Sequence, residues 1–188
     1  MIDRSASACT PPALAGLRPE PIPAPVIVDT CVLVAGLPTA GGPGPWACIV
    51  EGMRDGSIDF VASERLLREY RVVLARPAIA HRLRLPGGGV EGLLDELARR
   101  AHHCDPAPIA DGGRAAPDPG DAHLWALLRA DDRLRLLTLD RKLLAFSRMR
   151  RRVVTPGAWW RERSAAPGGQ TTAGQEPLPS GRLGTRPR

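Results

Sequence analysis

The chain alternates short apolar runs with longer stretches in which apolar residues recur every three to four positions. The apolar runs have the length of buried strands and lie at 26–28, 58–61, 104–109, 135–138 and 153–154. Strands that alternate with helices pair in parallel through right-handed crossovers. The pattern therefore predicts an α/β fold, a three-layer α/β/α domain with a mainly parallel central sheet.

Helical spacing fills most of the chain between these runs. Helices are expected over about 46–54, from Ser63 to the break at Arg76-Pro77, in two stretches after that break of which the second covers 90–103, from Asp118-Pro119 to about 130, over 142–147 and from Pro156. Ser63 is a suitable N-cap, and Thr155 followed by Pro156 is typical of a helix start. We find no internal repeat and no glycine spacing typical of a nucleotide-binding loop.

A single domain over residues 25–163 accounts for these elements. Residues 1–24 contain five prolines and no apolar stretch long enough for a signal peptide or a membrane span, so they are expected to form a flexible leader without membrane contact. Residues 164–188 contain five glycines and four prolines and are predicted to be a disordered tail. The four cysteines show no paired spacing, which favours a reducing, cytoplasmic location.

The charge of the chain is +6, of which +4 lies on residues 25–163. Such a basic body suits a polyanionic substrate. Aromatic residues make up only 4% of the chain, so a nucleic acid would be held through its phosphates rather than by base stacking. Four arginines within five residues are candidates for that role, and a solvated surface is the alternative: Arg148, Arg150, Arg151 and Arg152.

Two aspartates follow predicted strands. Asp29 comes directly after the run 26–28, and Asp140 comes just after the run 135–138. Ligands of open parallel sheets bind at the carboxyl ends of the strands, so both carboxylates are expected where chemistry occurs. Each also has a plainer interpretation, because aspartate is common at strand ends and helix N-caps.

Two further acidic residues lie on predicted helices. Glu69 flanks the apolar side of its helix, and an exposed surface charge is the alternative interpretation. Asp121 is aligned with the apolar side of its helix, although it also fits the first turn of a helix capped by Asp118. Asp118 is better explained as that cap and is kept as an auxiliary candidate. Clustered carboxylates repel one another, which makes a hard divalent cation the natural partner of such a set.

The order and context of these residues resemble the PIN-domain nuclease family over residues 25–160. The segments that carry the resemblance are Val-Ile-Val-Asp29-Thr-Cys-Val-Leu-Val, Ser63 with Glu69, Asp118-Pro-Gly-Asp121 and Leu-Leu-Thr138-Leu-Asp140. Within that family the chain resembles the toxin components of bacterial toxin–antitoxin pairs, the VapC-like proteins. The resemblance implies an Mg²⁺- or Mn²⁺-dependent endoribonuclease, with RNA as substrate, a small antitoxin protein as partner and a homodimer as a further assembly.

The resemblance also implies roles for individual residues. Asp29, Glu69, Asp121 and Asp140 would form the metal-binding and catalytic quartet, with Thr138 as a polar neighbour. The bound ion would activate a water for attack on a phosphodiester. One departure is Cys31, where relatives commonly have asparagine, because a thiol is a poor ligand for magnesium.

Two other functions remain open from the sequence. Asp29 could act as the covalent nucleophile of a phosphohydrolase, but such enzymes need a second acid two residues later, where Cys31 stands. The chain could also be a nucleic-acid-binding or protein-interaction module that keeps the fold without turnover. Loss of metal-dependent cleavage in Asp29→Asn and Asp140→Asn would separate an enzyme from a module.

Overall fold

The structure is a computed structural model that describes residues 24–85, 89–107, 118–146 and 151–165. It contains five strands: β1 (Val26–Val28), β2 (Val61–Ala62), β3 (His102–His103), β4 (Arg135–Leu137) and β5 (Val153–Val154). The predicted leader up to residue 23 and the predicted tail from residue 166 lie outside the described residues, as do Arg148 and Arg150.

All of the strand pairs are parallel. β4 pairs with β1 and with β5, while β2 pairs with β3. A bridge between Val26 and Phe60 joins the two groups, so the strands follow the order 3-2-1-4-5. From β1 the chain adds β2 and β3 on one side, and it later adds β4 and β5 on the other side. The carboxyl ends of β1 and β4 therefore form the switch point at which doubly wound sheets bind ligands.

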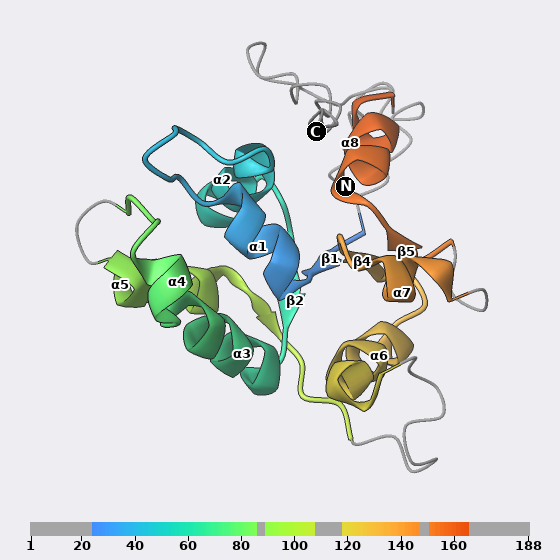
Figure 1. Cartoon of the computed structure of the whole chain (residues 1–188). Helices are drawn as coiled ribbons and strands as arrows, with labels where there is room; N and C mark the ends of the chain where they lie inside the picture. Colours follow the sequence, from blue (N-terminus) through green and yellow to red (C-terminus); the bar gives the residue numbers. More distant parts are fainter. Residues whose placement is uncertain (1–23, 86–88, 108–117, 147–150, 166–188) are drawn as a thin grey trace, which may run out of the picture.

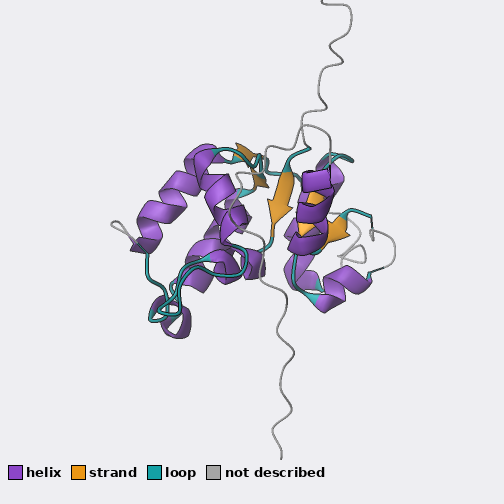
Figure 2. Ribbon diagram, turned by 90° about the horizontal axis from the view of Figure 1, so that it is seen from above, coloured by secondary structure: helices purple, strands orange, loops and turns teal. Residues whose placement is uncertain are grey.

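Helices cover both faces of the sheet. Their bounds are α1 (Thr30–Gly36), α2 (Ala47–Asp55), α3 (Glu64–Leu74), α4 (Pro77–Ala80), α5 (Gly89–Arg100), α6 (Ala122–Ala130), α7 (Arg141–Ala145) and α8 (Pro156–Ala165), with a 3-10 turn at Pro119–Asp121 before α6. Helices α1–α5 gather on one side of the strands and α6–α8 on the other (Figure 1, Figure 2). The predicted three-layer α/β/α fold is therefore confirmed.

Helix α1 is the element that the sequence pattern did not predict. It follows β1 after a single residue, Asp29, and its apolar residues resume at Cys31, directly after Thr30. An apolar run of this length does not by itself separate a buried strand from a buried helix. The available signal was Asp29 itself, whose side chain caps α1 by accepting a hydrogen bond from the Cys31 N–H.

The third strand also differs from its prediction. The pattern extended the preceding helix to residue 103, whereas α5 ends at Arg100 and His102 and His103 pair with β2. Both histidines are exposed, so apolar periodicity could not locate this strand. The predicted extended segment 104–109 begins after β3, and residues 108 and 109 lie outside the described part.

The core holds the carboxyl end of β1 in place. Val26, Ile27 and Val28 are completely buried, and the hydroxyl of Tyr70 on α3, itself fully buried, donates a hydrogen bond to the Val28 carbonyl. This bond fixes α3 beside the point where β1 ends, and Glu69 is the residue before Tyr70. In the described part of the chain, no helix combines the length and the apolar content that crossing a bilayer requires.

Candidate functional site

Four carboxylates line one cleft at the sheet's switch point. Asp29 follows β1, Glu69 lies on α3, Asp121 ends the 3-10 turn before α6, and Asp140 precedes α7. The cleft has a volume of about 490 Å³. Four segments that are far apart in the sequence therefore present acidic side chains to one space, as the sequence analysis predicted for these residues.

Asp29 is almost buried, with 8% of its surface exposed. Its Oδ2 accepts hydrogen bonds from the Thr138 hydroxyl at 2.5 Å and from the Cys31 thiol at 3.1 Å. Thr138 is completely buried and also accepts a hydrogen bond from the Asp140 backbone N–H at 3.0 Å. Thr138 therefore links the segments that carry two of the carboxylates, which gives the predicted polar neighbour a definite position.

Glu69 is held at both carboxylate oxygens. Its Oε1 accepts a hydrogen bond from the Thr30 hydroxyl at 2.6 Å, and its Oε2 lies 3.1 Å from Nε2 of His123. The contact with His123 is the main cause that lowers the pKa of Glu69, and burial opposes it. His123 was missed by the sequence analysis, and the only available signal was a histidine two residues after Asp121.

Asp121 carries the least compensated charge of the four. It makes no cap bond to α6, although it occupies the N-cap position. Burial, followed by the negative charges of Asp29, Asp118 and Asp140, raises the pKa of Asp121 above its ordinary value. The negative charges gathered around Asp121 form an electrostatic environment that favours a cation.

Asp118 and Asp140 both act as caps. The Asp118 carboxylate accepts a hydrogen bond from the Gly120 N–H at 2.8 Å, and it does not line the cleft. This agrees with the interpretation of Asp118 as a cap. Asp140 accepts from the Lys142 N–H at 2.7 Å and starts α7, but it also lines the cleft. The capping bond orients Asp140 without removing it from the site.

The four carboxylates have the oxygen donors that a hard divalent cation requires, although in the structure they do not surround a single point. Within the four described ranges, no three His, Cys, Asp or Glu side chains are close enough together to hold one ion. Each carboxylate oxygen has two lone pairs, so an oxygen that already accepts a hydrogen bond can still bind a metal. Oxygen-only donors are what Mg²⁺ and Mn²⁺ prefer, and these ions would be held by Asp29, Glu69, Asp121 and Asp140.

Cys31 takes part in the hydrogen bonds around Asp29. Its sulfur accepts from the Leu139 backbone N–H at 3.2 Å while its thiol donates to Asp29. Burial, followed by the charge of Asp29, raises the pKa of Cys31 to about 11, so the thiol stays neutral near pH 7 and keeps its hydrogen. An asparagine amide also offers a donor NH2 group and an acceptor oxygen, so an asparagine at this position could make the same two kinds of contact.

We therefore expect Cys31→Asn to retain the wild-type properties of the site, with any metal-dependent cleavage rate within about threefold of wild type. Cys31→Ala removes both the donor to Asp29 and the acceptor for Leu139. Loss of such supporting contacts lowers metal affinity or activity by about tenfold or more. Metal titrations of the three proteins provide the measurement, and equal behaviour of wild type and Cys31→Ala would show that the thiol does not support Asp29.

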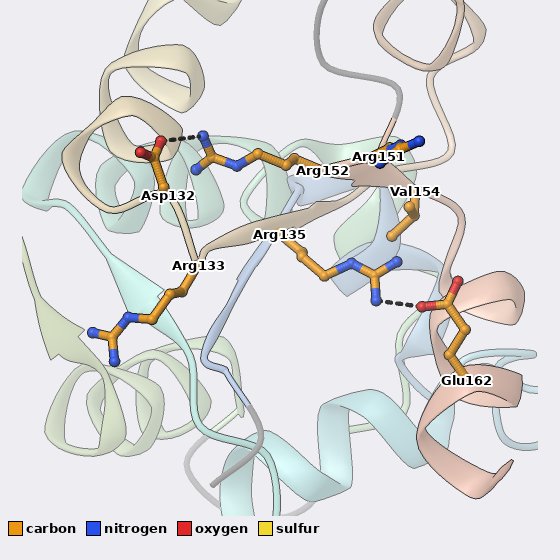
Figure 3. Close-up of a pocket in the computed structure, with 7 residues that line it drawn as sticks. All are labelled: Asp132, Arg133, Arg135, Arg151, Arg152, Val154 and Glu162. Carbon is orange, nitrogen blue, oxygen red and sulfur yellow. Dashed lines mark hydrogen bonds and ion pairs between the residues drawn. The ribbon is translucent and has the colours of Figure 1, made fainter. Parts of the chain in front are cut away.

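A second pocket, rich in arginine, lies near the amino ends of β4 and β5, and Figure 3 shows the residues that line it. It is lined by Asp132, Arg133, Arg135, Arg151, Arg152, Val154 and Glu162. Arg135 begins β4 and Arg152 directly precedes β5, whereas Asp140 follows β4. Because β4 and β5 are parallel, Arg151 and Arg152 lie at the amino ends of the strands and the carboxylates lie at the carboxyl ends.

Arg152 is engaged by the protein itself. Its guanidinium donates to the carbonyl of Leu128, to that of Asp131 at 2.5 Å and to that of Leu134 at 3.0 Å, and it pairs with Asp132 at 3.1 Å. These contacts leave little capacity for a phosphate and indicate a structural role. Arg151 is exposed and makes no hydrogen bond or ion pair with the described residues, so of the two it alone remains a candidate for phosphate contact.

A comparison with known protein families identifies the family of the chain. The family described as PIN domain matches residues 25–142, a span that includes all four carboxylates. The chain belongs to the PIN-domain family. PIN domains have a nuclease-type fold, and they typically use divalent metals and act on nucleic acids. No curated protein matches the chain.

Proposed function

We propose that the protein is an Mg²⁺- or Mn²⁺-dependent endoribonuclease that hydrolyses RNA phosphodiester bonds. The observation that carries the proposal is the placement of Asp29, Glu69, Asp121 and Asp140 around one cleft at the switch point of the sheet. When bound, the metal supplies an activated water and stabilises charge on the phosphodiester. Membership of the PIN-domain family supports this assignment.

The residues of the cleft have distinct roles in this proposal. Asp29, Glu69, Asp121 and Asp140 bind the metal, and Thr138 orients Asp29 through the hydrogen bond of 2.5 Å. Thr30 and His123 hold the two oxygens of Glu69. No side chain is required as a nucleophile, because the attacking group is water.

Cleavage of a labelled single-stranded RNA by the purified chain tests this function. We expect cleavage in Mg²⁺ or Mn²⁺ and none in excess chelator, with restoration when the metal is returned. Because water attacks rather than the ribose 2′-hydroxyl, the products should carry no 2′,3′-cyclic phosphate. Metal-independent cleavage, or cyclic phosphate ends, would contradict a metal-dependent hydrolysis.

The toxin role is a finer proposal that rests on the sequence segments around Asp29, Glu69, Asp121 and Asp140. It assigns the protein to the cytoplasm and gives it a small antitoxin partner, with a homodimer as a further assembly. Induced expression in bacteria should arrest growth, and the Asp140→Asn variant should not. A small protein encoded beside this chain should relieve the arrest when it is co-expressed, and growth unaffected by the wild-type protein would contradict the toxin role.

A module that keeps the fold without turnover is the second candidate. It is favoured by the protein contacts of Asp29 and Glu69, each of which already has both carboxylate oxygens close to protein donors. RNA binding without cleavage in any divalent metal would support it. A phosphohydrolase with Asp29 as nucleophile is less favoured, because Asp29 is almost buried and Cys31 provides no second acid.

A further inference from the structure

His123 connects two of the carboxylate-bearing segments. It lies in the first turn of α6, and its side chain is 6% exposed. Nδ1 lies 3.1 Å from the Gly120 carbonyl oxygen, and Nε2 lies 3.1 Å from Oε2 of Glu69. A carbonyl oxygen can only accept, so Nδ1 must carry the hydrogen of that bond, and Nε2 can donate to the Glu69 carboxylate only from a ring that carries hydrogens on both nitrogens. The backbone just before Asp121 therefore fixes the orientation of the ring.

Glu69 depends on such contacts for its position. A glutamate side chain has several rotatable bonds, and fixing it costs conformational entropy. Thr30 holds one oxygen by a short hydrogen bond, and His123 approaches the other at ion-pair distance without good hydrogen-bond alignment. The imidazole is thus the second protein group that lies against the Glu69 carboxylate.

A second contact joins the same two segments. Nη2 of Arg65 on α3 lies 3.5 Å from the Gly120 carbonyl oxygen, which also accepts from His123. Gly120 therefore joins the turn that carries Asp121 to the helix that carries Glu69. The Arg65 contact is exposed and long, so the buried His123 contact is the stronger of the two links.

We propose that His123 is a positioning residue that holds the Glu69 carboxylate beside Asp121 and so sets the affinity of the site for its divalent cation. The proposal rests on the metal-dependent function proposed above. His123 does not contact the ion or the substrate. It acts through Glu69, as outer partners of metal ligands do, and loss of such a partner costs about 10- to 100-fold in metal affinity.

Substitution of His123 by glutamine or by asparagine tests the contacts of the two ring nitrogens one at a time. The amide nitrogen of glutamine reaches about as far as Nε2, so His123→Gln can still donate to Glu69. That of asparagine reaches about as far as Nδ1, so His123→Asn can bond Gly120 but not Glu69. His123→Phe keeps the ring volume without either nitrogen, and it serves as the second loss variant if His123→Asn does not fold.

The test is a titration of the full chain with Mn²⁺ alone, in which the melting temperature is measured at each Mn²⁺ concentration. We expect the apparent Mn²⁺ dissociation constant to rise about tenfold or more in His123→Asn and His123→Phe, and to stay within about threefold of wild type in His123→Gln. The melting temperature without metal reports any purely structural effect.

The outcomes distinguish this inference from the proposed function. If Mn²⁺ stabilises wild type and all three variants with equal affinity, the positioning role is overturned and the metal site stands. If His123→Gln is as impaired as His123→Phe, the contact with Glu69 is not what matters and the inference also fails. If Mn²⁺ does not stabilise the wild type at all, the metal site itself is contradicted, and the inference falls with it.

Discussion

Asp140→Asn is expected to lower metal-dependent RNA cleavage by at least about 10²–10³-fold while the domain remains folded. The substitution removes one of four carboxylates from the cleft but preserves the capping bond to the Lys142 N–H, because asparagine and aspartate cap helices equally well. The melting temperature without metal should therefore change by no more than roughly 2 °C. Cleavage rates and thermal melts of the two proteins provide the measurement.

Asp55→Asn is the matched control. Asp55 also accepts a backbone hydrogen bond from the residue two positions later, the Ser57 N–H at 2.8 Å, but it lies at the end of α2 outside the cleft. The same isosteric loss of charge there should leave cleavage unchanged. A comparable loss of activity in both variants would indicate that total charge matters rather than the cleft.

Arg152→Gln is expected to have the largest effect on stability, a loss of about 2–4 kcal/mol in the free energy of unfolding. The guanidinium donates to three backbone carbonyls, including that of Leu128 in the last turn of α6, where carbonyl groups lack helical partners. Its positive charge also interacts favourably with the negative carboxyl end of the α6 dipole. Urea unfolding followed by circular dichroism measures the change.

Arg151→Gln is the control for this prediction, because the neighbouring side chain is exposed and makes no hydrogen bond or ion pair with the described residues. Its free energy of unfolding should change by less than about 0.5 kcal/mol. If Arg152→Gln were as stable as wild type but bound RNA more weakly, with a flatter dependence on salt, the phosphate role considered from the sequence would be correct for Arg152 after all.

The sequence predicted the parts of the site that local pattern determines. Asp29 and Asp140 follow buried strands, and parallel pairing brings such positions to one edge, so their approach could be expected before the structure was known. Glu69 and Asp121 lie on helices, where periodicity alone did not distinguish a site residue from a surface charge. Their assignment depended on the resemblance to a family.

The contacts that hold the carboxylates could not be predicted, because they join residues far apart in the chain. Thr30 bonds Glu69 across 39 positions, and Thr138 bonds Asp29 across 109 positions. Neither pairing leaves a periodic signal. The same holds for Arg152, whose local context suggested a solvated charge run, while its carbonyl partners lie 18 to 24 residues earlier.

Calorimetric titration of the purified full chain with Mn²⁺, without RNA, tests the central claim most directly. The account predicts saturable binding to the wild type, binding that is lost or greatly weakened in Asp140→Asn, and wild-type binding in Asp55→Asn. Equal Mn²⁺ binding by all three proteins, or no binding by the wild type, would contradict the claim that the four carboxylates form a metal site.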